Sequence, residues 1–123
     1  MNRAQIYSEI EEYSEVLGAS PHRLIEMLID KSLVNISQAS MAIKMKQTLQ
    51  KRTSICKAND IVIYLRDCLD DSADPVLVKK IAGIYTHVER QLFRANSTDN
   101  LAALEECTTI MNNIKIWWNN VAH

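Results

Sequence analysis

Four stretches of the sequence repeat apolar residues with the period of a helix, three of them at alternating spacings of three and four and the first at spacings of four, eight and seven, and this pattern decides what the chain can fold into. Such spacing places apolar side chains along one stripe of an α-helix. The stripes are, in chain order, Leu24, Leu28, Ile36 and Ile43; Ile55, Ala58, Val62, Leu65 and Leu69; Val78, Ile81, Tyr85, Val88, Leu92 and Ala95; and Leu104, Cys107, Met111, Ile114, Trp118 and Val121. The joints between the stretches are short, so neighbouring helices must run antiparallel and bury their stripes against one another. We therefore predict an all-α, antiparallel up-down-up-down four-helix bundle.

Two of the four helices begin with the same short signal, a capping side chain followed by proline. Ser20-Pro21 opens the first stretch and Asp74-Pro75 opens the third. A serine or aspartate side chain accepts a hydrogen bond from a free N–H of the first turn, and proline has no N–H there to leave unpaired. The first helix should therefore run from Ser20 to about Ile43.

The other helix boundaries carry weaker signals. The apolar register changes near residues 44–47, where we expect the first helix to break, and the second helix should stop within residues 70–73. We expect residues 96–99 to close the third helix and to cap the fourth. Gly83 lies inside the third helix, where glycine costs about 1 kcal/mol relative to alanine, and we interpret it as the site of a close helix contact.

Composition supports helices and excludes several functions. The 123 residues include two glycines and two prolines, too few for the turns of a β protein. This length is sufficient for one domain with its own core. The net charge of −1 gives no indication of nucleic-acid binding. Neither an N-terminal leader nor an apolar run of about 18 residues is present, so we expect no signal peptide and no membrane span.

Three cysteines, Cys56, Cys68 and Cys107, cannot all pair with one another, and no two of them form a Cys-x-x-Cys motif. This favours reduced thiols in a cytosol over a disulfide framework. Because they lie on or beside apolar stripes, we interpret them as small core residues.

Residues 1–18 form an acidic N-terminal arm that ends at Gly18. A helix this short is marginal in isolation, so we expect the arm to dock on a groove of the bundle, which occupies residues 19–123. We interpret the arm as a placeholder that covers apolar surface until a partner arrives. Its apolar residues, at spacings of three and four, are Ile6, Tyr7, Ile10, Tyr13 and Leu17.

Charge is unevenly distributed along the chain. Residues 31–66 carry seven basic groups and one acidic group. We interpret the basic residues close together in this segment as a solvated turn between two helices rather than as an anion site. They are Lys44, Lys46, Lys51, Arg52 and Lys57.

The sequence contains no recognisable catalytic or metal-binding constellation. A carboxylate-bridged two-metal site in a bundle needs Glu-x-x-His pairs, but Ala19 stands three residues before His22 and Ile84 three residues before His87. We interpret His22 as part of a helix cap and His87 as a polar residue on an outer face. No glycine-rich phosphate loop or nucleophile–base pair is present, so we expect no enzyme, no cofactor and no metal.

Several apolar residues lie outside the four stripes and extend the apolar surface of the bundle beyond its inner face. Together they predict that a helical partner, or the arm, covers grooves on the outside. They are Ile63 and Tyr64; Leu77, Ile84 and Phe93; and Ile110, Ile116 and Trp117.

Strings of residues along most of the chain resemble the flagellar export chaperone family FliS. The most specific are the string that begins at Ala19 and the Leu-x-x-Ala-Asn-x-x-Asp turn that ends at Asp99. The matching residues are Tyr7 and Ile10; Ala19-Ser20-Pro21-His22-Arg23-Leu24-Ile25, Met27-Leu28, Asp30 and Leu33; Lys57-Ala58, Ile61-Val62, Leu65-Arg66 and Leu69-Asp70; Ile84-Tyr85, Arg90, Leu92, Ala95-Asn96 and Asp99; and Trp117.

This resemblance implies a cytosolic flagellar export chaperone. Such a protein binds the disordered C-terminal segment of flagellin, prevents its premature polymerisation and delivers it for type III flagellar export. The implied partners are flagellin and the flagellar export machinery, and the implied state is a monomer or weak homodimer. We place the flagellin groove at Tyr7, Ile10, Ile61, Tyr64, Leu77, Ile84 and Phe93. An alternative stays open: a non-enzymatic regulatory or structural bundle that forms homo-oligomers through the same apolar grooves.

Overall fold

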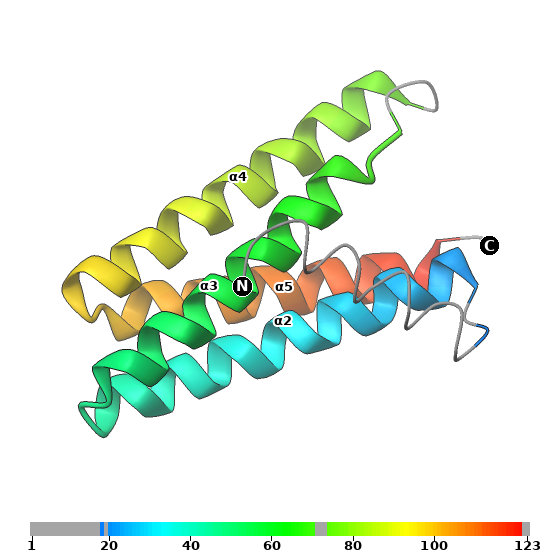
Figure 1. Cartoon of the computed structure of the whole chain (residues 1–123). Helices are drawn as coiled ribbons and strands as arrows, with labels where there is room; N and C mark the ends of the chain where they lie inside the picture. The colour runs from blue at the N-terminus through cyan, green and yellow to red at the C-terminus, as the bar shows by residue number, and fades with distance from the viewer. Residues whose placement is uncertain (1–17, 19, 71–73, 122–123) are drawn as a thin grey trace.

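The structure, a computed structural model, describes residues 18, 20–70 and 74–121, and this part of the chain forms four long helices. They are α2 (Pro21–Lys44), α3 (Thr48–Asp67), α4 (Pro75–Thr98) and α5 (Leu101–Asn120). Both α2 and α4 pack against α3 and α5, so the helices form a closed ring in which successive helices run in opposite directions (Figure 1). The predicted all-α, antiparallel four-helix bundle is confirmed. Within the described residues, no helix combines the length and apolarity needed to cross a membrane.

Most of the core is built from the four predicted stripes, and other apolar positions of the same helices, among them Ile29 and Ile61, complete it. Positions near the middle of each stripe are buried, whereas most of those at the stripe ends are half-buried because they lie near the ends of the bundle, where neighbouring helices cover them less. The largest fully buried apolar side chains come from all four helices. They are Ile29 and Ile36; Ile61 and Val62; Val88 and Leu92; and Leu104, Cys107 and Met111.

The helix starts follow from capping side chains. Ser20 accepts a hydrogen bond from the N–H of Arg23 at 3.2 Å, and Asp74 accepts one from the N–H of Leu77 at 3.2 Å, so both predicted cap-plus-proline starts are confirmed. The cap of α5 is Asn100, which accepts from the N–H of residue 103 at 3.0 Å. The prediction that residues 96–99 supply this cap is wrong, because α4 continues to Thr98 and residue 99 is its C-cap.

The helix ends depend on backbone geometry that periodicity does not reveal. At the end of α2, the N–H of Lys46 bonds to the carbonyl of Ile43 at 3.2 Å and that of Gln47 to the carbonyl of Ala42 at 2.8 Å. This pair of bonds is a Schellman motif with Lys46 in the left-handed conformation at φ 56°. The predicted break at residues 44–47 is confirmed, whereas α3 ends at Asp67, before the predicted range 70–73.

Lys51 departs from its predicted role as part of a solvated turn. Its residue surface is 9 % exposed, and its Nζ donates to the carbonyl of Asn96 at 2.9 Å and to the carboxylate of Asp99 at 2.6 Å. Asp99 has φ 53°, a left-handed conformation that reverses the chain between α4 and α5. Lys51 therefore joins α3 to this turn and satisfies a carbonyl at the end of α4.

Candidate functional site

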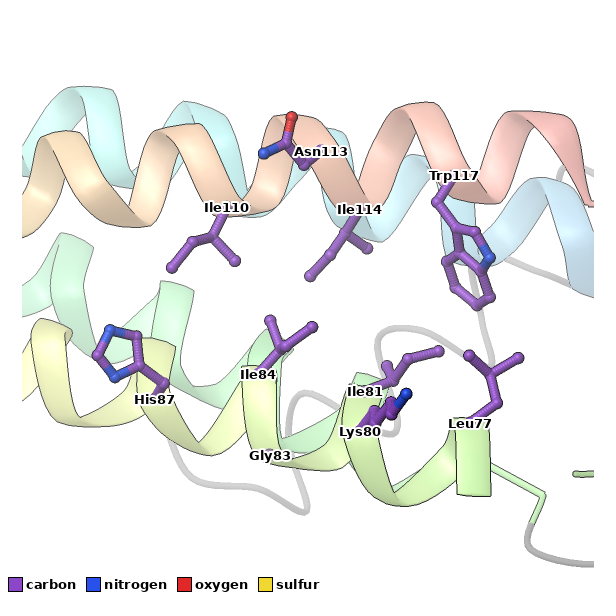
Figure 2. Close-up of a pocket in the computed structure, with 10 residues that line it drawn as sticks. All are labelled: Leu77, Lys80, Ile81, Gly83, Ile84, His87, Ile110, Asn113, Ile114 and Trp117. Carbon is purple, nitrogen blue, oxygen red and sulfur yellow. The ribbon is translucent and has the colours of Figure 1, made fainter. Parts of the chain in front are cut away.

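An open apolar groove of about 610 Å³ lies between α4 and α5. These helices meet at the Asp99 turn and diverge toward the start of α4 (Figure 1), and the groove lies where they have separated. Figure 2 shows apolar side chains of the two helices facing one another across it. The lining residues are Leu77, Lys80, Ile81, Gly83, Ile84 and His87 on α4, and Ile110, Asn113, Ile114 and Trp117 on α5.

The groove follows from apolar residues beside the core stripe of α4. Ile81 belongs to the stripe and is buried, whereas Leu77 and Ile84, four residues before it and three after, are each 41 % exposed. Residues at these spacings lie on one side of a helix, so the apolar face of α4 is wider than α3 and α5 together can cover. The uncovered part of this face is one wall of the groove.

Gly83 is also part of this wall, and the prediction of a close helix contact there is wrong. A methyl group placed on its Cα would meet no atom within 4 Å, and the residue is exposed. Nothing within the described bundle therefore requires glycine at this helical position.

Polar residues join the two walls at one end of the groove. His87 on α4 hydrogen-bonds to Glu106 on α5, and the side-chain amide of Gln91 donates to the other oxygen of Glu106 at 2.7 Å. The hydrogen bond from His87 lowers the pKa of Glu106, with a smaller contribution from Gln91. As predicted, His87 is exposed on an outer face, but it also fixes the spacing of α4 and α5 beside the groove.

At the other end of the groove, Trp117 is positioned by its neighbour Trp118. The indole N–H of Trp118 donates to the carbonyl of His22 at 2.9 Å, and Nε2 of His22 donates to the carbonyl of Trp118 at 3.0 Å. The two rings stack with centroids 4.6 Å apart and an interplanar angle of 12°. Trp117 lies 5.8 Å from Trp118 between ring centroids. This His22–Trp118 clasp fixes the last turn of α5, and with it one wall of the groove.

The titratable groups of the described residues offer no activated nucleophile. Burial raises the pKa of the Cys107 thiol to about 12 and raises that of the Tyr85 phenol well above its usual range. Burial also raises the pKa of Cys68. Thiols shifted in this direction remain protonated and unreactive near neutral pH. In the same part of the chain, no cluster of three or more His, Cys, Asp or Glu side chains has metal-binding geometry.

Only one of the three cysteines matches its predicted role as a small core residue. Cys107 is fully buried, and its Sγ lies 3.8 Å from the carbonyl of Val88. Cys56 and Cys68 are exposed and free. Their interpretation as core residues is wrong, because each lies on the outer side of its stripe or beyond the end of its helix.

The structure brings together two of the seven residues proposed for the partner site. Leu77 and Ile84 line the groove (Figure 2). Ile61 is fully buried in the core, Tyr64 is half-buried against the core, and Phe93 is 72 % exposed but does not line the groove. Tyr7 and Ile10 lie outside the described residues.

Sequence reasoning did not assign the second wall of the groove to the site. Ile110 and Trp117 were recognised as apolar residues outside the stripes, and Ile114 as a stripe residue, but none was placed opposite α4. The available signal was the excess of apolar residues on both helices. Which two helices separate, however, depends on tertiary packing.

The fold and the groove define a class of protein: a helical bundle with an exposed apolar groove between two of its helices. The sequence model of the family described as "Flagellar protein FliS" matches residues 3–123, and the chain therefore belongs to the FliS family. This family membership makes it a flagellar secretion chaperone, a role that is not enzymatic.

Curated relatives support the same assignment. The flagellar secretion chaperone FliSB of Pseudomonas aeruginosa is 28 % identical over 123 residues, which cover 100 % of this chain and 98 % of that protein. The flagellar secretion chaperone FliS of Escherichia coli is 31 % identical over 115 residues, 93 % of this chain and 85 % of that protein. The FliS of Salmonella typhimurium is 27 % identical over 117 residues, 94 % and 87 % of the two chains.

Proposed function

We propose that the groove between α4 and α5 binds the C-terminal segment of flagellin and withholds it from polymerisation before export. The observation that carries this proposal is the groove itself: two apolar walls face each other across a space of about 610 Å³, with exposed Leu77 and Ile84 on one side. An apolar groove of this form suits the apolar face of an amphipathic segment.

The energetics of such a complex are consistent with reversible binding. A disordered segment that folds on binding loses several kcal/mol of its gross interaction energy to ordering. Dispersed apolar contacts along a groove can offset this cost without an anchor that would prevent release. We infer that the loaded protein acts in the cytosol and passes flagellin to the flagellar export machinery.

We also propose that residues 1–17 act as a placeholder on the same groove. The acidic, apolar-striped arm predicted from the sequence would cover apolar surface and be displaced by flagellin. Hydrogen exchange tests this idea: amides of residues 7–17 should exchange faster when a synthetic flagellin C-terminal peptide is added. Slower exchange in the arm would show that it is part of the clamp and would contradict the placeholder role.

Replacing Ile84 by serine tests the groove. Full burial of an isoleucine side chain is worth about 1.5–3 kcal/mol, and 41 % of Ile84 is still exposed in the free protein. The lost contact should therefore cost about 1 kcal/mol, roughly fivefold in the dissociation constant of the flagellin peptide by calorimetry. Ile116→Ser is the matched control, because Ile116 is 60 % exposed on α5 and does not line the groove.

The outcome of these measurements separates the chaperone from the homo-oligomer. Equal affinity of the Ile84→Ser and Ile116→Ser variants for the peptide would remove the groove from the binding site. Sedimentation addresses the alternative: a stable dimer of the free protein that Ile84→Ser dissociates would assign the groove to self-association. Phe93→Ser then shows whether the flagellin surface extends beyond the groove along α4.

A further inference from the structure

A second exposed apolar surface surrounds the turn between α2 and α3. Met41 and Met45, one helical turn apart at the end of α2, are 56 % and 60 % exposed, and Leu49 in the first turn of α3 is 73 % exposed. Methionine side chains are flexible and polarisable, and they adapt to differently shaped apolar partners. We use the name turn surface for these three residues together with the neighbouring cations Lys44, Lys46 and Arg52.

Unpaired cations lie among these apolar residues. Lys44, Lys46 and Arg52 are exposed, and none of them forms an ion pair with any described residue. The neighbouring Lys51 differs, because its charge is matched by Asp99. The first turn of α5, which lies at the same end of the bundle, contains no acidic residue. This surface is therefore both apolar and positively charged.

The turn surface is separate from the groove. The contact of Lys51 with Asn96 and Asp99 shows that the α2–α3 and α4–α5 turns lie at the same end of the bundle. The groove lies toward the other end, where α4 and α5 have separated (Figure 1). Both surfaces can therefore be occupied at the same time.

We propose that the turn surface docks an acidic amphipathic segment of a second protein, whose apolar side chains contact Met41, Met45 and Leu49 and whose carboxylates pair with the free cations. This proposal does not depend on the identity of the ligand in the groove. Charge complementarity across such a surface speeds association and selects the partner.

Two other occupants fit the turn surface less well. Anionic membranes are recognised by clusters of about four to eight basic residues, whereas three free cations are present here. The arm of the same chain joins α2 at the far end of this helix. A helix of 17 residues would be about 26 Å long, against about 36 Å for the 24 residues of α2, so a helical arm would not reach Met45.

A synthetic peptide tests the proposal on the full-length protein. The probe is an 18-residue helical peptide with leucines on one face and glutamates on the other. Titration followed by ¹⁵N–¹H spectra should shift amides of residues 41–52 and leave those of Ile84 and Ile110 unchanged. Affinity measured by fluorescence anisotropy should fall as salt rises, because exposed charges are screened.

Variants then separate charge from general stickiness. Combined Lys44→Gln, Lys46→Asn and Arg52→Gln substitutions should weaken binding of the peptide at least tenfold; asparagine is used at position 46 because it tolerates the left-handed conformation. Lys79→Gln with Lys80→Gln is the control, since both lysines lie on α4, away from the turn surface, with Lys80 in the wall of the groove and Lys79 next to it. The affinity of this double variant for the peptide should stay within twofold of the affinity of the original protein.

Four results would overturn the proposal. The first is that the peptide shifts only amides of the groove, and the second is that a peptide with lysines in place of its glutamates binds equally well. The third is that the protein binds phosphatidylglycerol vesicles but not the peptide. The fourth is that the free protein forms a dimer, which the triple substitution dissociates. The amide map of the unmodified protein decides the site even if a variant is unstable.

Discussion

Gly83 lies in the middle of α4, and replacing it by alanine should make the protein more stable. Alanine is favoured over glycine inside a helix by about 0.8–1 kcal/mol. The new methyl group would meet no atom within 4 Å, so no clash offsets this gain. For a chain of this size, the free energy of unfolding should rise by about 1 kcal/mol and the melting temperature by about 4 °C.

The same substitution at Gly18 is the control. A methyl group there also meets no atom within 4 Å, but Gly18 has φ 60°, a left-handed conformation that alanine adopts at a cost of about 1–2 kcal/mol. The two glycine-to-alanine variants should therefore move the urea midpoint in opposite directions. A lower midpoint for Gly83→Ala would show that α4 is packed at this residue and that the groove is not open there.

Binding supplies an independent readout for the Gly83→Ala variant. If the flagellin segment lies against α4 at this turn, the methyl group occupies space that the segment needs, and the affinity should fall severalfold while stability rises. Lower affinity with higher stability is not expected from a change that merely perturbs the fold. Unchanged affinity would refute a close approach of the segment to Gly83.

Three further predictions concern side chains of the core and of the groove end. Lys51→Met should lower the free energy of unfolding in urea by about 1–3 kcal/mol, because it removes a nearly buried charge-assisted hydrogen bond. Cys107→Ser should cost about 1–3 kcal/mol by placing a hydroxyl in the core, whereas Cys56→Ser should stay within about 0.5 kcal/mol in the same assay. The pKa of Glu106 is lowered in the folded state, so the ionised carboxylate stabilises the fold above the pKa of the free carboxyl, near 4.5, and this stabilisation is lost as the pH falls below that value. The difference in melting temperature between the original protein and Glu106→Gln should therefore shrink over that acid range. A constant difference would rule out the His87 contact as its cause.

The bundle could be predicted from the sequence because its determinants are local. Periodicity identified the buried faces, and Ser20 and Asp74 marked two helix starts through hydrogen bonds within one turn. The ends of the helices were harder to place. The left-handed turn residue Asp99 is held by Lys51, which reaches it from a different helix.

The groove could be predicted only in part, for a related reason. Leu77 and Ile84 were recognised because they lie outside the core stripe of their own helix. Assigning Ile110 and Trp117 to the opposite wall requires the relative positions of α4 and α5, which no local pattern specifies. The burial of Ile61 is a second example, because a matching string of residues does not indicate whether a side chain is buried or exposed.

The His22–Trp118 clasp has a consequence for the order of assembly. The clasp joins residues 96 positions apart, whereas α2 and α3 are joined by a turn of three residues. Short-range contacts form first, because long loops cost more entropy to close, so the α2–α3 hairpin should precede the docking of α5. During synthesis on the ribosome, the second wall of the groove is made last, and a nascent chain that ends before Ile110 has no groove. If the groove holds the flagellin segment, as we propose, binding has to wait until α5 has been translated and has docked.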